Sequence, residues 1–155
     1  MSTYLGLHYH IIFATKDRRP FIKPDQQPRL HEYLGGIVGS LDGKCRIAGG
    51  VEDHVHLLIS LKATHRLSDF MRELKKGSSS WFSETFGIKR FQWQEGYAAI
   101  TVSPGARTEV TDYIRNHAEH HWKKTIREEF LRILKLAKID FDPKYIDDDT
   151  QEYLG

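Results

Sequence analysis

Two histidines on one predicted strand are the first residues of this sequence that could do chemistry. His54 and His56 stand two residues apart in the run HVHLLIS. On a β-strand this spacing puts both side chains on one face, about 6–7 Å apart, which would let both imidazoles bind one metal ion. The opposite parity is apolar and is assigned to the core: Val55, Leu57, Ile59 and Leu61. A histidine pair of this kind is also compatible with ordinary buried or surface histidines.

A second group lies in the segment DYIRNHAEHHW, which is predicted to be helical. Tyr113, His117 and His120 have the spacing i, i+4 and i+7, so they share one stripe of a helix, with His121 at its border. A tyrosine beside possible metal ligands is a candidate nucleophile. The alternative is that Tyr113 packs in the core and that the histidines favour the negative end of the helix dipole.

The elements that must position these residues alternate along the chain. Apolar alternation predicts four strands, at 4–14, 44–51, 54–61 and 97–103. Helical spacing predicts helices at 25–41, from a cap at Thr64 or Ser68 to about Phe86, from 109 to about 122, and at 123–138. The order β-α-β-β-α-β predicts an α+β, ferredoxin-like (split βαβ) fold, with a four-stranded antiparallel sheet and two helices on one face.

Length and charge bound the classes of protein that remain. A chain of 155 residues fits one domain. The formal net charge of +2 neither favours nor excludes a nucleic-acid partner. The charge is uneven, since residues 62–90 hold seven Lys and Arg against three Asp and Glu, whereas residues 137–155 hold two against six. The small total therefore conceals a basic middle and an acidic tail.

Several classes are excluded by missing motifs. The single cysteine, Cys45, allows no intrachain disulfide and no Cys-rich zinc site, which fits a cytoplasmic location. No signal peptide or membrane-spanning apolar run is visible, so no membrane partner is expected. Gly43 and Lys44 lack the rest of a phosphate-binding loop, and His31 lacks the second histidine of a zincin helix.

Four blocks in order resemble one known family. They read YHIIFATKDRRP at 9–20, GVEDHVHLLI at 50–59, WQEGYAA at 93–99 and YIRNHAEHH at 113–121. Together they resemble the insertion sequence 200-like, single-tyrosine transposases, in which two histidines flank an apolar residue (HUH). The resemblance covers roughly residues 4–125.

The resemblance implies a DNA transposase of the HUH-nuclease type. Residues 1–125 would form the catalytic domain, and 126–155 would add a C-terminal helix and an acidic tail to that same domain. The expected activity is metal-dependent cleavage and strand transfer of single-stranded DNA through a 5′-phosphotyrosine, with recognition of DNA hairpins. Tyr113 would be the nucleophile, and His54 and His56 would bind the metal.

The third ligand is expected at His117, four residues after the tyrosine, where the family usually has Gln. A nitrogen in place of an amide oxygen should shift the preference from Mg²⁺ toward Mn²⁺. His120 is a candidate general base for Tyr113, whose free pKa is near ~10. Residues that could contact DNA are the cations of the basic stretch and one aromatic ring for stacking: Arg66, Arg72, Lys75, Lys76, Lys89, Arg90 and Trp93.

The family's members resemble one another in working as dimers, with the tyrosine helix of one subunit completing the histidine site of the other. Gly105 and Ala106, just before the Tyr113 helix, could serve as the hinge. Two other functions stay open. One is a non-catalytic or domesticated hairpin-DNA-binding protein. The other is a metal-dependent phosphoesterase that uses His54, His56 and His117 with water as the nucleophile.

Overall fold

A four-stranded antiparallel sheet forms the frame of the protein. The computed structural model describes residues 1–117 and 126–142. The strands lie in the order β2-β3-β1-β4, so β1 pairs with β3 on one side and with β4 on the other. Their bounds are His8–Ala14 for β1, Lys44–Gly50 for β2, His54–Ser60 for β3 and Ala98–Val102 for β4.

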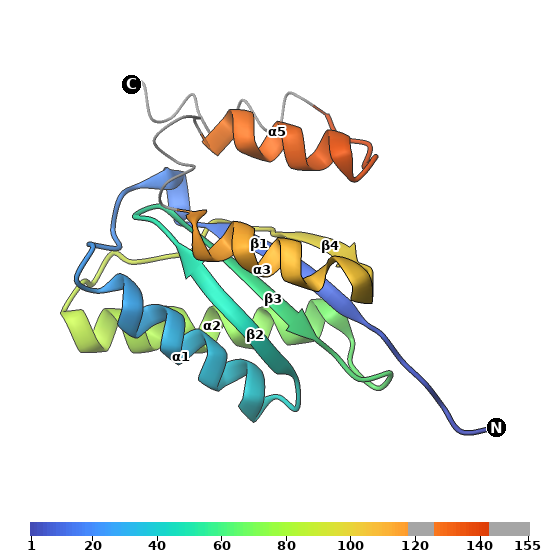
Figure 1. The fold of residues 1–155 in the computed structure, drawn as a ribbon. Helices are drawn as coiled ribbons and strands as arrows, with labels where there is room; N and C mark the ends of the chain where they lie inside the picture. Colours follow the sequence, from blue (N-terminus) through green and yellow to red (C-terminus); the bar gives the residue numbers. More distant parts are fainter. Residues whose placement is uncertain (118–125, 143–155) are drawn as a thin grey trace.

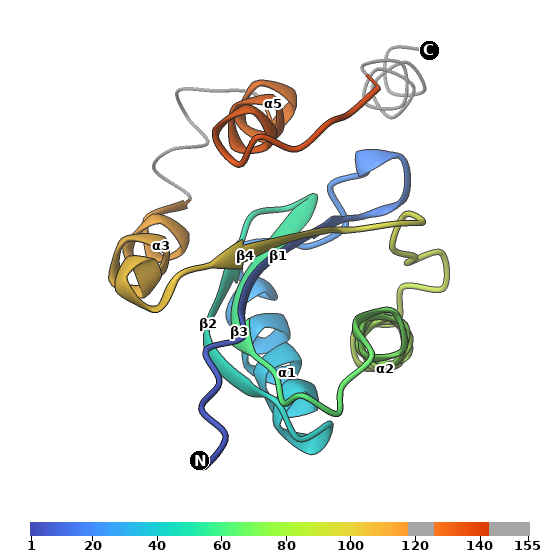
Figure 2. The same cartoon turned by 90° about the vertical axis from the view of Figure 1, so that its right-hand side faces the viewer.

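Helices cover both faces of this sheet (Figures 1 and 2). The helices α1 (Gln27–Ser40) and α2 (Leu67–Phe86) lie on one face. The helices α3 (Arg107–Arg115) and α5 (Ile126–Leu136) lie on the other face. Two short 3₁₀ turns, η1 (Lys16–Arg18) and η2 (Pro104–Ala106), follow β1 and β4. Among the described helices, none has the length and apolar character needed to cross a membrane.

The predicted α+β, ferredoxin-like fold is confirmed, and the differences are at element ends. The first strand begins at His8 instead of residue 4. The predicted caps of α2 are wrong, because Arg66 is its N-cap and makes no capping hydrogen bond through its side chain. The helix expected at 109–122 begins at Arg107, and the part of that prediction from 118 onward lies outside the described residues.

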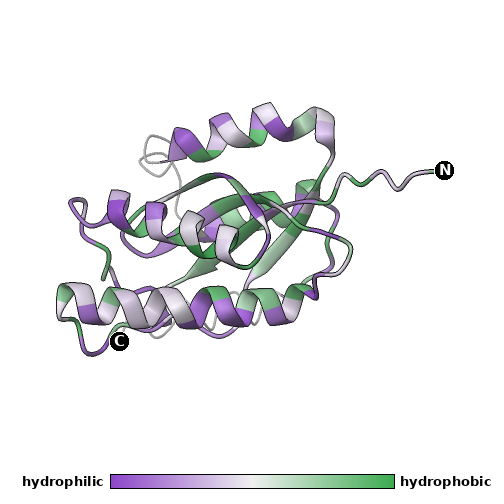
Figure 3. Cartoon of the chain, turned by 90° about the horizontal axis from the view of Figure 1, so that it is seen from below, coloured by the Kyte–Doolittle hydropathy of each residue, from purple (hydrophilic) through white to green (hydrophobic). Residues whose placement is uncertain are grey.

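The main core fills the space between the sheet and the two helices α1 and α2. Val55, Leu57 and Ile59 project into it from β3, as the parity of the strand predicts. They meet fully buried side chains of the two helices, among them Leu34 and Phe82. In Figure 3, hydrophobic (green) and hydrophilic (purple) residues alternate along the helices, as expected for helices with one buried face.

The second face of the sheet carries a smaller apolar cluster under α3, with Leu58 and Ile114 at its centre. The helix comes close to β2 at Gly49. A Cβ at this position would lie 2.9 Å from both Cγ2 and the carbonyl oxygen of Ile114. Only a glycine therefore allows this approach, which sets the distance between α3 and the sheet.

Candidate active site

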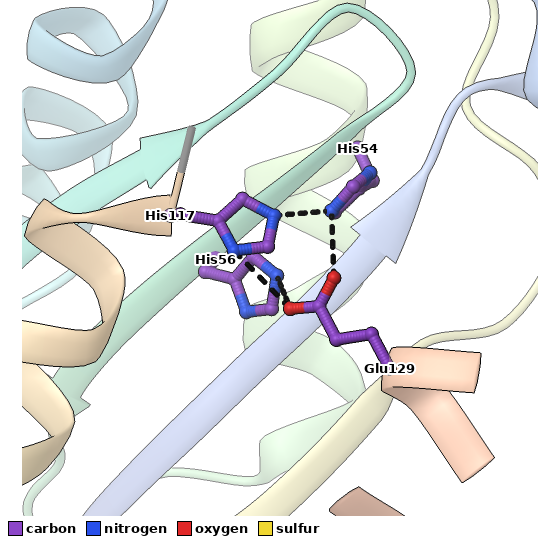
Figure 4. A group of neighbouring side chains, drawn as sticks. All are labelled: His54, His56, His117 and Glu129. Carbon is purple, nitrogen blue, oxygen red and sulfur yellow. Dashed lines mark hydrogen bonds and ion pairs between the residues drawn. The ribbon is translucent and has the colours of Figure 1, made fainter. Parts of the chain in front are cut away.

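Three histidines and one glutamate converge on the α3 and α5 side of the sheet (Figure 4). His54 and His56 come from β3, His117 follows α3, and Glu129 lies on α5. All four are buried, and one ligand atom from each lies within 4.8 Å of the others. The parity of β3 explains the placement, because the histidines alternate with the core residues and so face away from α1 and α2.

The distances between these donors are short. His54 Nε2 and His117 Nε2 are 2.7 Å apart. Glu129 Oε1 lies 3.1 Å from His117 Nδ1 and 3.5 Å from His56 Nε2, and Glu129 Oε2 lies 3.9 Å from His54 Nε2. The carboxylate therefore faces all three imidazoles, as the dashed lines of Figure 4 show.

Two further residues orient the strand histidines from behind. The Asp53 carboxylate lies 2.7 Å from His54 Nδ1, and His10 Nε2 lies 2.8 Å from His56 Nδ1. Such outer contacts fix the tautomer and the ring direction of a metal-binding histidine. They leave the Nε2 atoms of both strand histidines facing the cluster.

Burial and neighbouring imidazoles favour the neutral form of two histidines in this cluster, His56 and His10. Burial lowers the pKa of His56 well below its usual 6.5, and the neighbouring His54, His10 and His117 lower it further. Burial also lowers the pKa of His10 to about 4. A neutral imidazole is the form that binds a metal.

Tyr113 reaches the same cluster from α3. Its hydroxyl donates a hydrogen bond to Glu129 Oε1, and its ring centroid lies 5.9 Å from those of both His56 and His117. Burial raises the pKa of the Tyr113 phenol, and the hydrogen bond to Glu129 raises it further. Beside the tyrosine, a cavity of about 750 Å³ opens between β4, α3 and α5.

The donor set fits a divalent transition metal. Three imidazole nitrogens and one carboxylate oxygen are the ligands that suit Mn²⁺, Fe²⁺ or Zn²⁺ better than the all-oxygen shell that Mg²⁺ prefers. His56 Nε2 is fully buried and accepts or donates no hydrogen bond among the described residues. A bound cation would satisfy this nitrogen.

The structure thus brings together Tyr113, His54, His56 and His117, all four named from the sequence. Glu129 and His10 take part as well, although sequence reasoning gave neither of them a role. One sequence signal pointed to Glu129. It stands four residues before Ile133 and seven before Leu136, so it shares a helix face with two apolar residues that line the same cavity. The candidate base, His120, lies outside the described residues.

The predicted DNA contacts on α2 lie on the face of the sheet away from the histidines. Arg66 and Arg72 are exposed, and both form ion pairs with Asp69. Lys75 has a structural task, since its Nζ donates to the carbonyl oxygens of Gln94 at 2.6 Å and Gly96 at 2.8 Å. Burial also lowers the Lys75 pKa.

The remaining predicted contacts differ in their surroundings. Lys76 is exposed on α2, and Lys89 and Arg90 are exposed in the loop between α2 and β4. Trp93 was expected to stack on a base. Its side chain is only 9% exposed in the main core, and its Nε1 donates to Ser78 Oγ at 3.0 Å.

Comparison with known proteins identifies the family. A family model described as "Transposase IS200 like" matches residues 3–117. The chain is 29% identical, over 117 residues, to the transposase for insertion sequence element IS200 of Salmonella typhimurium, covering 72% of this chain and 76% of the relative. It is 25% identical to the ISDra2 transposase TnpA of Deinococcus radiodurans, covering 71% and 83%.

Two solved structures share the fold. A crystal structure described as a transposase from Deinococcus radiodurans has a TM-score of 0.60 and 26% identity, covering 75% of this chain and 95% of that one. A REP-associated tyrosine transposase bound to a REP hairpin has a TM-score of 0.57 and 20% identity, covering 83% and 79%. With its four-stranded antiparallel sheet and its buried histidine cluster, this chain belongs to the family of IS200-like transposases.

Proposed function

We propose that this transposase cleaves and rejoins single-stranded DNA through a covalent bond between Tyr113 and a 5′-phosphate, with a divalent metal held by His54, His56 and His117. One observation carries the proposal. The Tyr113 hydroxyl contacts Glu129, the same carboxylate that faces the three histidines. The candidate nucleophile and the candidate metal ligands therefore share one site.

Cleavage would be a single displacement at the phosphorus atom. The Tyr113 oxygen attacks the phosphorus, the bond from phosphorus to the 3′-oxygen breaks, and that oxygen leaves with a proton as a 3′-hydroxyl. The phenol gives up its own proton to a base. Glu129 Oε1 already accepts the hydrogen bond from Tyr113 and stands where such a base is needed. Attack by a second 3′-hydroxyl reverses the step and joins a new strand without ATP.

His54, His56 and His117 would hold the metal, and Glu129 offers a carboxylate as a further ligand. When bound, the metal would neutralise charge on the phosphodiester and align it for in-line attack. Of the two ions expected from the sequence, we favour Mn²⁺ over Mg²⁺, because three of the four donors are imidazole nitrogens. The cavity of about 750 Å³ beside Tyr113 offers room for the nucleotides around the scissile phosphate.

We propose hairpin-forming single-stranded DNA as the partner. The support is the family together with the REP hairpin bound to one structural neighbour. Residues 126–155 are proposed to belong to the catalytic domain, because α5 supplies Glu129 to the site. A homodimer and a cytoplasmic location are proposed on the family resemblance and on the single cysteine. Light scattering of the purified protein measures the first of these.

The test uses single-stranded oligonucleotides that tile the hairpins flanking the gene, each labelled at the 3′ end. The fragment downstream of the cut keeps this label, so wild-type protein with Mn²⁺ should yield a labelled covalent adduct on a denaturing gel. Tyr113→Phe should give neither an adduct nor a cut, and chelation with EDTA should stop the wild-type reaction. Tyr97→Phe, which changes an exposed tyrosine outside the site, is the matched control.

The other functions predict different results. Cleavage that survives in Tyr113→Phe but not in His56→Ala would indicate the water-dependent phosphoesterase. Tight hairpin binding without any adduct in the wild type would indicate the non-catalytic binding protein.

A further inference from the structure

A basic pocket lies beside the end of β1, and none of its lining residues belongs to the histidine cluster. Its volume is about 290 Å³. Two loops supply its cations, namely Lys16 and Arg19 from the segment after β1, and Lys89 and Arg90 from the segment between α2 and β4. Lys16 and Arg19 lie outside the basic stretch that the sequence singles out.

The four cations of this pocket carry uncompensated charge. All four are exposed, and none forms an ion pair with another described residue. Asp17 is the one carboxylate in the lining. Arg66 and Arg72 on α2 differ, since both are paired with Asp69. Converging cations with so little neutralisation attract a polyanion.

The walls of the pocket are held in place by contacts between the two loops. The Lys16 amide donates to the Gln92 carbonyl oxygen at 2.8 Å, and Phe21 packs edge-to-face on Phe91 with centroids 5.7 Å apart. Asp17 has a φ of 56°, a left-handed conformation that residues other than glycine rarely adopt. The chain thus turns sharply between Lys16 and Arg19, and both cations line one hollow.

The pocket is tied directly to the histidine site. The Thr15 amide donates to the Asp53 carbonyl oxygen at 2.9 Å, and the Asp53 carboxylate contacts His54 Nδ1 at 2.7 Å. Ala14 is the partner of His54 in the sheet, so Lys16 follows two residues after the strand pair that carries this ligand. The segment that carries Lys16 is therefore anchored to the strand that carries His54.

We propose that this pocket binds a backbone phosphate of the single-stranded DNA next to the cleavage site. The cations of Lys16, Arg19, Lys89 and Arg90 would contact the phosphate, and the Phe21 ring gives the attached nucleoside an apolar surface. The inference rests on the proposed function. Its test measures binding alone, so the two can fail separately.

The experiment compares two double variants in a Tyr113→Phe background, which binds DNA without cutting it. A fluorescent oligothymidylate strand, which cannot form a hairpin stem, is titrated at a series of salt concentrations. Arg19→Gln with Lys89→Gln should weaken binding about tenfold at low salt and reduce the log–log salt slope by about 1.4, because each phosphate that a cation neutralises on a single strand adds about 0.7 to this slope. Arg19→Gln alone should reduce it by about half as much.

The matched control is Arg46→Gln with Lys62→Gln, which removes the same charges from exposed positions toward the other end of the sheet. This control pair should reduce the log–log salt slope much less than the pocket pair does. The inference would be overturned if both pairs reduced the salt slope equally. It would also be overturned if the reduction appeared only with a hairpin duplex probe, or if the parent protein did not bind the strand. Circular dichroism confirms that all variants are folded. If the wild type forms no covalent adduct, the proposed function fails. The binding titration still shows whether the pocket contacts single-stranded DNA.

Discussion

The two faces of β3 are both buried, yet they hold opposite chemistry. Val55, Leu57 and Ile59 pack against α1 and α2 in an apolar core. On the other face, His54 and His56 are equally buried, at 0% and 1% exposure, but lie among nitrogen and oxygen atoms. Burial by itself therefore does not define an apolar core. The two faces differ in the side chains that the covering helices present to them.

The helices explain this difference. On the core side, α1 and α2 present aliphatic and aromatic side chains such as Leu34 and Phe82. On the site side, α5 presents Glu129. Burying polar groups costs free energy unless they find partners, so this second face is stable only because its donors and acceptors meet one another or a cation.

The largest effect is expected for His56→Ala, which removes a donor from the site face. Loss of this proposed metal ligand should reduce DNA cleavage by at least about 1,000-fold, since metal assistance is worth several kcal/mol of barrier. Single-turnover cleavage of the labelled hairpin measures this. His65→Ala, which removes an imidazole that contacts the Leu41 carbonyl oxygen, is the control and should retain cleavage. Full activity of His56→Ala would contradict the assignment.

Leu57→Ala tests the core face one residue away. Removing this fully buried side chain should lower the free energy of unfolding by about 2–5 kcal/mol. At a temperature where the variant is folded, cleavage should stay within a few-fold of the wild type. Urea denaturation and the cleavage assay, run on the same sample, measure the two quantities. A variant that kept its stability but lost cleavage would show that the faces are not separable.

Gly49→Ala probes how the site-side helix is seated. The new methyl group would meet Ile114 at 2.9 Å, so α3 must shift outward, at a cost of about 1–3 kcal/mol. Because α3 carries Tyr113 and leads to His117, cleavage should fall as well. Gly36→Ala, where nothing lies within 4 Å, should do neither. Thermal melts and cleavage rates compare the two, and equal behaviour would show that the approach at Gly49 is not needed.

The smallest effect on cleavage is expected for His31, which lies on α1 in the helix layer on the other face of the sheet. Burial lowers its pKa to about 4 from 6.5, and its Nε2 has no hydrogen-bond partner among the described residues. Below pH 6.5 the unfolded chain binds a proton at His31 that the folded chain does not. The contribution of His31 to the free energy of unfolding is therefore complete above this pH and is lost as the pH falls toward 4. The slope from His31 should approach about 1.4 kcal/mol per pH unit.

His31→Gln should flatten the pH dependence of unfolding between pH 6.5 and 4 relative to the wild type. Urea melts in EDTA at several pH values measure the difference. Parallel curves for the two proteins would show that His31 titrates normally in the folded state.

The sequence predicts one face of β3 better than the contacts that complete the other. Alternation identifies the core residues, and because a strand has only two faces it also places His54 and His56 together. Helical spacing likewise aligns Tyr113 with His117. These inferences need only local geometry.

Other features depend on tertiary contacts and could not be predicted. Glu129 joins the site because α5 packs over this face of the sheet, and its helical spacing to Ile133 and Leu136 indicates a shared helix face but not what that face contacts. Trp93 is aromatic and follows a basic stretch, yet its indole is paired with Ser78 in the core. The pocket formed by Lys16, Arg19, Lys89 and Arg90 depends on contacts between two loops that lie far apart in the sequence.

The most direct measurement of the central claim is the position of the covalent bond. After reaction of the wild type with hairpin DNA and Mn²⁺, nuclease treatment and tryptic digestion should leave the peptide TEVTDYIR, residues 108–115, carrying a nucleotide on Tyr113. Tandem mass spectrometry locates the modified residue. We predict a phosphodiester to the Tyr113 oxygen that disappears in His56→Ala and in EDTA. An adduct on another residue, or efficient cleavage with this peptide unmodified, would contradict the account.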